Sequence, residues 1–114
     1  MATNKDYIAY LEDCLQHIPE IRFRAMFGGY TLYCCDVPVG LVDDNTLYIK
    51  VNIGTTPLLA EKVKTGPPYP GGKEAYILTE AEFEDKPFIA QVITAGRDAL
   101  AKNLKPAGKV RPKK

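Results

Sequence analysis

The sequence contains no tryptophan, one histidine and three cysteines among its 114 residues. It has no apolar run near the ~20 residues that a membrane-spanning helix needs, and its first residues lack the apolar segment of a secretory signal. One histidine and an odd number of cysteines argue against a zinc site and a secreted disulfide framework. We therefore expect a cytoplasmic protein with reduced thiols, without a metal or another cofactor, and without membrane contact.

The formal net charge of +1 conceals an uneven distribution. Before Lys102 there are nine basic and fourteen acidic residues, which gives this part a net charge of −5, whereas the rest has six basic residues and no acid. This length is typical of one domain, so we predict a domain over residues 1–104 and a basic tail over residues 105–114. The tail can bind nucleic acid or an acidic partner, or be only a solvated end. Its charges are Lys105, Lys109, Arg111, Lys113 and Lys114.

Three segments have helical patterns, and they cover about residues 4–17, 56–64 and 85–104. The first has apolar residues at helical spacing, which indicates a packing helix. The second is predicted to begin with Thr56 as N-cap and Pro57 at the first helical position. Thr79, with Glu82 three residues later, matches a capping box, and Asp85 opens the last helix.

Two glycines define the predicted first hairpin. Apolar residues alternate before them, and Gly28-Gly29 suits a two-residue turn that requires positive φ. This turn would pair Phe23 with Cys34 and point both side chains to the inner face of a sheet. Because neighbouring strand residues point to opposite faces, we expect Cys35 outside and no disulfide between Cys34 and Cys35.

The second hairpin has two possible registers. A two-residue loop at Asp44-Asn45 would place Leu41 opposite Tyr48 and leave the apolar rows out of phase. A three-residue loop that ends at Thr46 instead places Leu41 on the inner face. The apolar pattern favours this longer loop, with Asn45 in the left-handed conformation.

A segment rich in proline and glycine, residues 66–72, is predicted to be an irregular connection before a strand at residues 75–78. The expected order of elements is α-β-β-β-β-α-β-α. Strands joined by tight turns are antiparallel, and helices must cover their apolar face. The predicted fold class is therefore α+β, with two layers: an antiparallel meander sheet and helices packed on one face.

One combination of motifs strongly resembles the TfoX N-terminal domain family, over about residues 7–100. It consists of Arg24-Ala25-Met26-Phe27-Gly28-Gly29-Tyr30 followed by Leu47-Tyr48-Ile49-Lys50-Val51. The resemblance implies a relative of bacterial regulators of natural competence, which act with the cyclic-AMP receptor protein at certain promoters. It also implies a fold like that of secretion chaperones, and no enzymatic activity or cofactor.

The predicted strand phases gather basic, aromatic and methionine side chains on the outer face of the sheet. Such a surface can stack bases and hold phosphates, but Tyr, Met and Arg are also enriched at protein interfaces. A solvated face, or one covered in a homodimer, is the structural alternative. The candidate interaction residues are Arg22, Arg24, Met26, Tyr33, Tyr48 and Lys50.

No catalytic triad, metal motif or nucleotide fingerprint occurs in the sequence, so we do not expect an enzyme. We expect a non-enzymatic protein that acts by contact with a protein partner in transcription regulation. Direct nucleic-acid binding by the outer face and the tail is the alternative. An uncharacterised enzyme or small-molecule binder would need a concave pocket with perturbed titratable groups.

Overall fold

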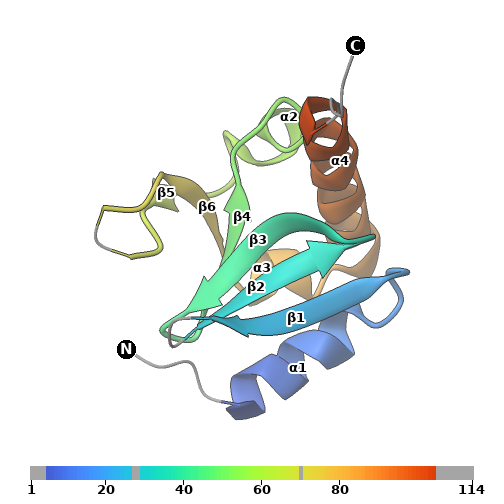
Figure 1. Ribbon diagram of the computed structural model, residues 1–114, viewed down its shortest axis with the longest axis vertical. Helices are drawn as coiled ribbons and strands as arrows, with labels where there is room; N and C mark the ends of the chain where they lie inside the picture. Colours follow the sequence, from blue (N-terminus) through green and yellow to red (C-terminus); the bar gives the residue numbers. More distant parts are fainter. Residues whose placement is uncertain (1–4, 27–28, 70, 105–114) are drawn as a thin grey trace.

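The computed structural model describes residues 5–26, 29–69 and 71–104. Figure 1 shows the arrangement of its helices and strands along the chain. The elements are α1 (Lys5–Leu15), β1 (Ile21–Met26), β2 (Gly29–Cys34), β3 (Val37–Asp43), β4 (Thr46–Lys50), α2 (Thr56–Leu59), β5 (Thr65–Gly66), β6 (Ala75–Leu78), α3 (Glu80–Phe83) and α4 (Lys86–Leu104).

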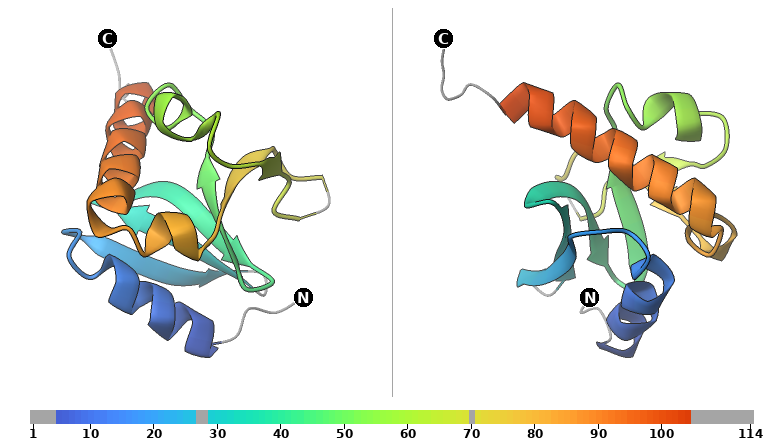
Figure 2. Two further views of the ribbon diagram at one scale, coloured as in Figure 1. Left: turned by 180° about the vertical axis from the view of Figure 1, so that it is seen from behind. Right: turned by 90° about the vertical axis from the view of Figure 1, so that its right-hand side faces the viewer.

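The strands form one antiparallel sheet in the order β1-β2-β3-β4-β6-β5. Seen from behind, α1, α3 and α4 lie in front of the strands (Figure 2). The loop between β5 and β6 extends to the left in Figure 1, away from α4 on the right. The predicted α+β class, with an antiparallel sheet and helices on one face, is confirmed.

The core lies between the inner face of the sheet and the helices. It consists of apolar side chains from both layers, and their burial is the main force that holds the layers together. From the sheet it contains Leu32, Cys34, Val39, Val42, Leu47, Ile49, Tyr76 and Leu78. From the helices and their connections it contains Ile8, Leu11, Leu15, Ile18, Leu59, Phe83, Ile89, Val92 and Ile93.

The predicted register of the first hairpin is wrong by two residues. Ile21, and not Phe23, pairs with Cys34, and Phe23 pairs with Leu32. Because the shift is an even number, the described side chains of β1 and β2 stay on their predicted faces. Gly29 is already part of β2, where it pairs with Met26, so it is not a turn residue.

The predicted three-residue loop of the second hairpin is also wrong. Asp44 and Asn45 form a two-residue turn, both with positive φ (51° and 55°), and Leu41 pairs with Tyr48. An irregularity in β3 keeps the buried apolar side chains on the inner face despite this short turn. Leu32 of β2 pairs with Gly40, but the next residue, Tyr33, pairs with Pro38, so one residue of β3 between them has no partner. The extra residue in β3 is a β-bulge, and it turns Leu41 to the outer face.

Helix α2 starts earlier and is shorter than predicted. Thr55, and not Thr56, is the N-cap residue of α2, and the helix ends at Leu59. The Thr55 side chain is fully buried, and its hydroxyl donates to the Lys50 carbonyl at 2.8 Å. The Asn52 Oδ1 accepts the backbone N–H groups of Gly54 and Thr55 at 2.9 and 3.0 Å. These bonds hold the turn tightly, which explains why the helix starts one residue early.

Two short elements were not predicted. β5 begins one residue before the segment expected to be irregular, and it pairs with β6, with Thr65 opposite Tyr76 and Gly66 opposite Ala75. α3 begins at the predicted capping box, where the Thr79 backbone N–H donates to the Glu82 carboxylate at 2.7 Å. The predicted strand before it and the long final helix after it are confirmed.

Candidate interaction surface on the sheet

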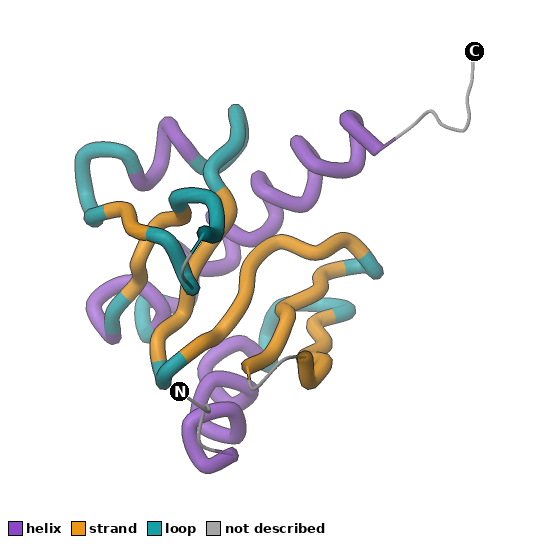
Figure 3. Tube along the Cα trace, turned by 60° about the vertical axis from the view of Figure 1, so that its left-hand side comes forward, coloured by secondary structure: helices purple, strands orange, loops and turns teal. Residues whose placement is uncertain are grey.

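None of the described helices lies across the outer face of the sheet (Figure 3). In Figure 3 its strands lie nearer to the viewer than α4. One row of paired residues crosses the face from β1 to β6, and it changes from basic through polar to apolar and aromatic. The row is Arg24, Thr31, Leu41, Tyr48 and Ile77.

Arg22 and Tyr33 form a pair beside this row. They are register partners, and the Arg22 guanidinium lies 5.3 Å from the centroid of the Tyr33 ring. Arg22 also forms an ion pair with Asp36 at 3.1 Å, but both side chains are more than half exposed. Such a pair contributes only about 0–1 kcal/mol, so the guanidinium can exchange this carboxylate for a ligand at little cost.

Tyr48 and Lys50 lie on β4, an inner strand of the sheet, and both are half-buried. Burial, followed by the negative charges of Asp43 and Asp44, raises the pKa of Tyr48 above its usual value of 10.0. Burial, followed by the positive charge of Lys73, lowers the pKa of Lys50 below 10.5. The lysine is therefore less well solvated than a fully exposed lysine.

The structure adds apolar side chains to this surface. Leu41 was predicted to face inward, and Ile77 was not assigned to a face; both are half-buried on the outer side. Met26 is 45% exposed and accepts the Thr31 hydroxyl at 3.9 Å on its sulfur. Only the bulge places Leu41 here, and no local pattern marks a bulge. The outer face is therefore more apolar than the sequence indicates.

Of the other predicted site residues, the structure describes Asn45 and Gly29. Asn45 has the expected left-handed conformation, whereas Gly29 has a different role from the predicted one. A Cβ at Gly29 would lie 2.4 Å from the Val42 carbonyl oxygen, so glycine allows close approach of two strands. Gly28 lies outside the described residues, and so do the basic residues of the tail: Lys105, Lys109, Arg111, Lys113 and Lys114.

A pocket of about 380 Å³ lies between the end of α1 and β1. Its walls combine apolar side chains with two carboxylates, and they are formed by Glu12, Gln16, Ile18, Pro19, Glu20, Ile21 and Phe23. Within residues 5–26, 29–69 and 71–104, no three His, Cys, Asp or Glu side chains are grouped as metal ligands. No helix in these ranges is long and apolar enough to cross a membrane.

The model of the TfoX N-terminal domain matches residues 13–100, which is most of the chain. The chain belongs to the TfoX N-terminal domain family. It is also 32% identical over 102 residues to an uncharacterised 12.7 kDa protein in the trpE 5′ region of Spirochaeta aurantia. That match covers 88% of this chain and 85% of the relative.

Membership in the TfoX N-terminal domain family is consistent with a protein that resembles competence regulators. The outer face provides apolar and aromatic area for packing, and guanidinium groups for hydrogen bonds at its edge. This composition is typical of interfaces between proteins.

Proposed function

We propose that this chain is a non-enzymatic regulatory protein that binds a protein partner in transcription regulation through the outer face of its sheet. The observation that carries the proposal is the β3 bulge, which turns Leu41 outward beside Tyr48. Apolar and aromatic side chains with arginine at the edge are characteristic of interface cores and hot spots. Membership in the TfoX N-terminal domain family supports the regulatory role.

Charge also supports a protein partner over a nucleic acid. The chain before Lys102 has a net charge of −5, whereas electrostatic attraction to phosphates provides most non-specific nucleic-acid affinity. Of the basic residues on the outer face, Arg22 is paired with Asp36 and Lys50 is half-buried. Arg24 is exposed at the start of the row.

A capture experiment with matched variants tests the proposal. The full chain is immobilised and exposed to a lysate of its own host cell, and the bound proteins are identified by mass spectrometry. We expect a transcription-associated protein that binds the wild type and is lost with Leu41→Lys. The control is Gln91→Lys, which adds the same charge at an exposed position of α4. Recovery of no transcription-associated protein, or equal loss with both variants, would count against the proposal.

Direct nucleic-acid binding is the second candidate, and the Arg22–Tyr33 pair favours it because a cation beside a ring resembles a base-stacking platform. Fluorescence anisotropy with a single-stranded oligonucleotide at low and high salt distinguishes the two candidates. Nucleic-acid binding requires an affinity that falls steeply with salt and that decreases in Arg24→Ala and without Lys109–Lys114. Lys64→Ala, at an exposed position near β5, is the matched control.

A homodimer that covers the outer face would exclude both candidates. Size-exclusion chromatography with light scattering gives the oligomeric state of the wild type and of Leu41→Lys. We expect a monomer in both cases. A wild-type dimer that Leu41→Lys dissociates would show that a second copy occupies this face.

A further inference from the structure

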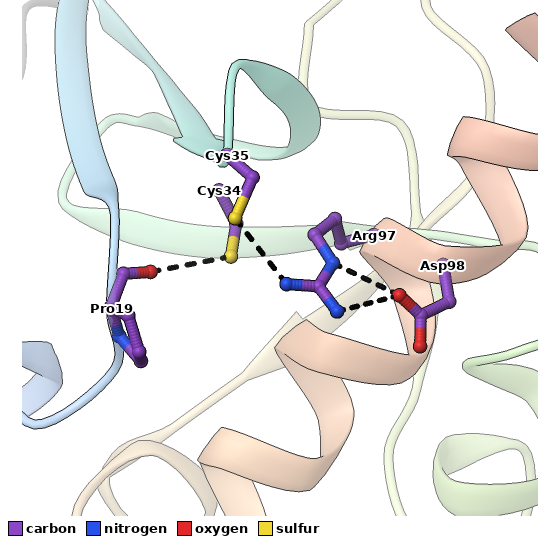
Figure 4. A network of polar contacts seen from close by, with 5 residues as sticks. All are labelled: Pro19, Cys34, Cys35, Arg97 and Asp98. Atoms are coloured by element: carbon purple, nitrogen blue, oxygen red, sulfur yellow. Dashed lines mark hydrogen bonds and ion pairs between the residues drawn. The ribbon is translucent and has the colours of Figure 1, made fainter.

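Two adjacent cysteines and an arginine meet where the β2–β3 turn faces α4 (Figure 4). Cys35 and Asp36 both have positive φ, 53° and 65°, and the Cys35 backbone N–H donates to the Glu20 carbonyl at 3.0 Å. Cys35 is therefore in a tight turn and not in a strand. Cys34 is buried and Cys35 is exposed, as predicted. Because Cys35 lies in the turn, its side chain is nevertheless close enough to influence the Cys34 thiol.

Arg97 is held in position to contact this pair. Its Nε and Nη2 atoms donate to the Asp98 carboxylate at 3.0 and 2.6 Å. The remaining Nη1 donates to the Cys35 sulfur at 3.3 Å. A guanidinium that is fixed by two bonds to a carboxylate loses little freedom when it makes the third contact. Cys35 is exposed, and its sulfur accepts a hydrogen bond from a guanidinium that is also ion-paired with Asp98.

The two sulfurs differ in access. Cys34 is 1% exposed, and its thiol lies 3.7 Å from the Pro19 carbonyl oxygen to which it donates. Burial, followed by the charge of Cys35, raises the pKa of Cys34 to about 11. A reagent from solvent therefore meets Cys35 first, and Cys34 remains a protonated thiol behind it.

We propose that Cys35 is a peroxide-reactive thiol and that Cys34 resolves its oxidised form. Exposed cysteines beside a cation are the ones that react with oxidants. This proposal does not depend on the partner binding proposed above for the outer face.

The chemistry has two steps. The Cys35 sulfur attacks one oxygen of the peroxide, the O–O bond breaks, and the second oxygen leaves as water with the thiol proton. Sulfur is oxidised to a sulfenic acid and the peroxide is reduced. The Cys34 sulfur then attacks the sulfenic sulfur, the S–O bond breaks, and water leaves with the Cys34 proton as the disulfide forms. The raised pKa of Cys34 disfavours its thiolate and therefore slows this second step.

The test treats the full chain with hydrogen peroxide in the presence of dimedone, which traps sulfenic acids, and follows each cysteine by peptide mass spectrometry. Cys14, half-buried on α1, is the internal control. We expect Cys35 to be labelled about tenfold faster than Cys14. Arg97→Gln should slow the labelling of Cys35, and Arg97→Lys should restore most of it. Equal rates at Cys14 and Cys35, or no effect of Arg97→Gln, would overturn the proposal.

The role of Cys34 has its own readout without dimedone. The wild type should lose two hydrogens per chain and remain monomeric on a non-reducing gel, whereas Cys34→Ala should gain one oxygen. If Cys34→Ala does not fold, a dimedone titration of the wild type serves instead, because the trap must compete with the disulfide. A disulfide-linked dimer, or a stable wild-type sulfenic acid, would overturn the resolving role.

Discussion

Lysine substitutions at neighbouring positions of β3 test the bulge directly. Val42 is 1% exposed and faces the core, whereas Leu41 is half-buried on the outer face. Val42→Lys and Leu41→Lys add the same charge, one residue apart in the same strand. The two variants therefore differ mainly in the face on which the ammonium group lies.

The expected magnitudes follow from this difference in burial. An ammonium at Val42, between its register partners Tyr30 and Leu47, has no described acid opposite it and costs several kcal/mol. That is a large part of a typical unfolding free energy of about 5–15 kcal/mol. At Leu41 the lysine stem can lie along the sheet with its charge in water, at a cost of about 1 kcal/mol.

Thermal unfolding followed by circular dichroism measures both variants. For a domain of this size, about 1 kcal/mol lowers Tm by roughly 4–8 °C. We expect a shift in that range for Leu41→Lys, and for Val42→Lys a loss of roughly 20 °C or more, or no cooperative transition. If Leu41→Lys is the more damaging substitution, then Leu41 faces the core and the assigned bulge is wrong.

Three further predictions concern other parts of the fold. Thr79→Ala removes the hydroxyl that donates to Glu82 at 2.9 Å and should cost about 1 kcal/mol in urea unfolding; an unchanged midpoint would contradict it. Gly54→Ala places a Cβ 2.2 Å from the Ala95 carbonyl oxygen in α4 and should cost about 1–3 kcal/mol; a wild-type Tm would refute this close contact. The Tyr48 phenol should titrate above pH 10.0. Because the folded state favours its neutral form, its stabilisation is complete below pH 10.0 and is lost as pH rises through the raised pKa. The ultraviolet difference between the wild type and Tyr48→Phe measures this titration, and a midpoint at or below 10.0 would disprove the shift.

The alternation of apolar and polar residues correctly predicts which face each side chain of the first hairpin lies on. It does not predict which residues of the two strands pair. The alternation that assigns Phe23 to the inner face and Arg24 to the outer face is unchanged by a shift of two residues. Phe23 therefore lies on its predicted face although its partner is Leu32 and not Cys34. The choice between such registers depends on which turn closes the hairpin and on the packing of both strands.

The candidate surface was predictable only in part, for the same reason. The alternation of side chains in β1, β2 and β4 is regular, so it correctly predicts which residues lie on the outer face. These residues are Arg22, Arg24, Tyr33 and Tyr48. Leu41 follows the bulge, so its phase depends on a residue that the ladder leaves unpaired.

The sequence alone determined the class of the fold, the capping box, the family and the left-handed Asn45, because each depends on residues close together in the chain. Tertiary structure decided the β-bulge, the two-residue strand β5 and the contact between Cys35 and Arg97, since each requires segments far apart in the sequence to meet. A contact between distant segments leaves no periodic pattern in the sequence of either segment, so the sequence pattern does not predict it. Its stability comes from backbone and side-chain contacts that exist only after the sheet and α4 have packed together.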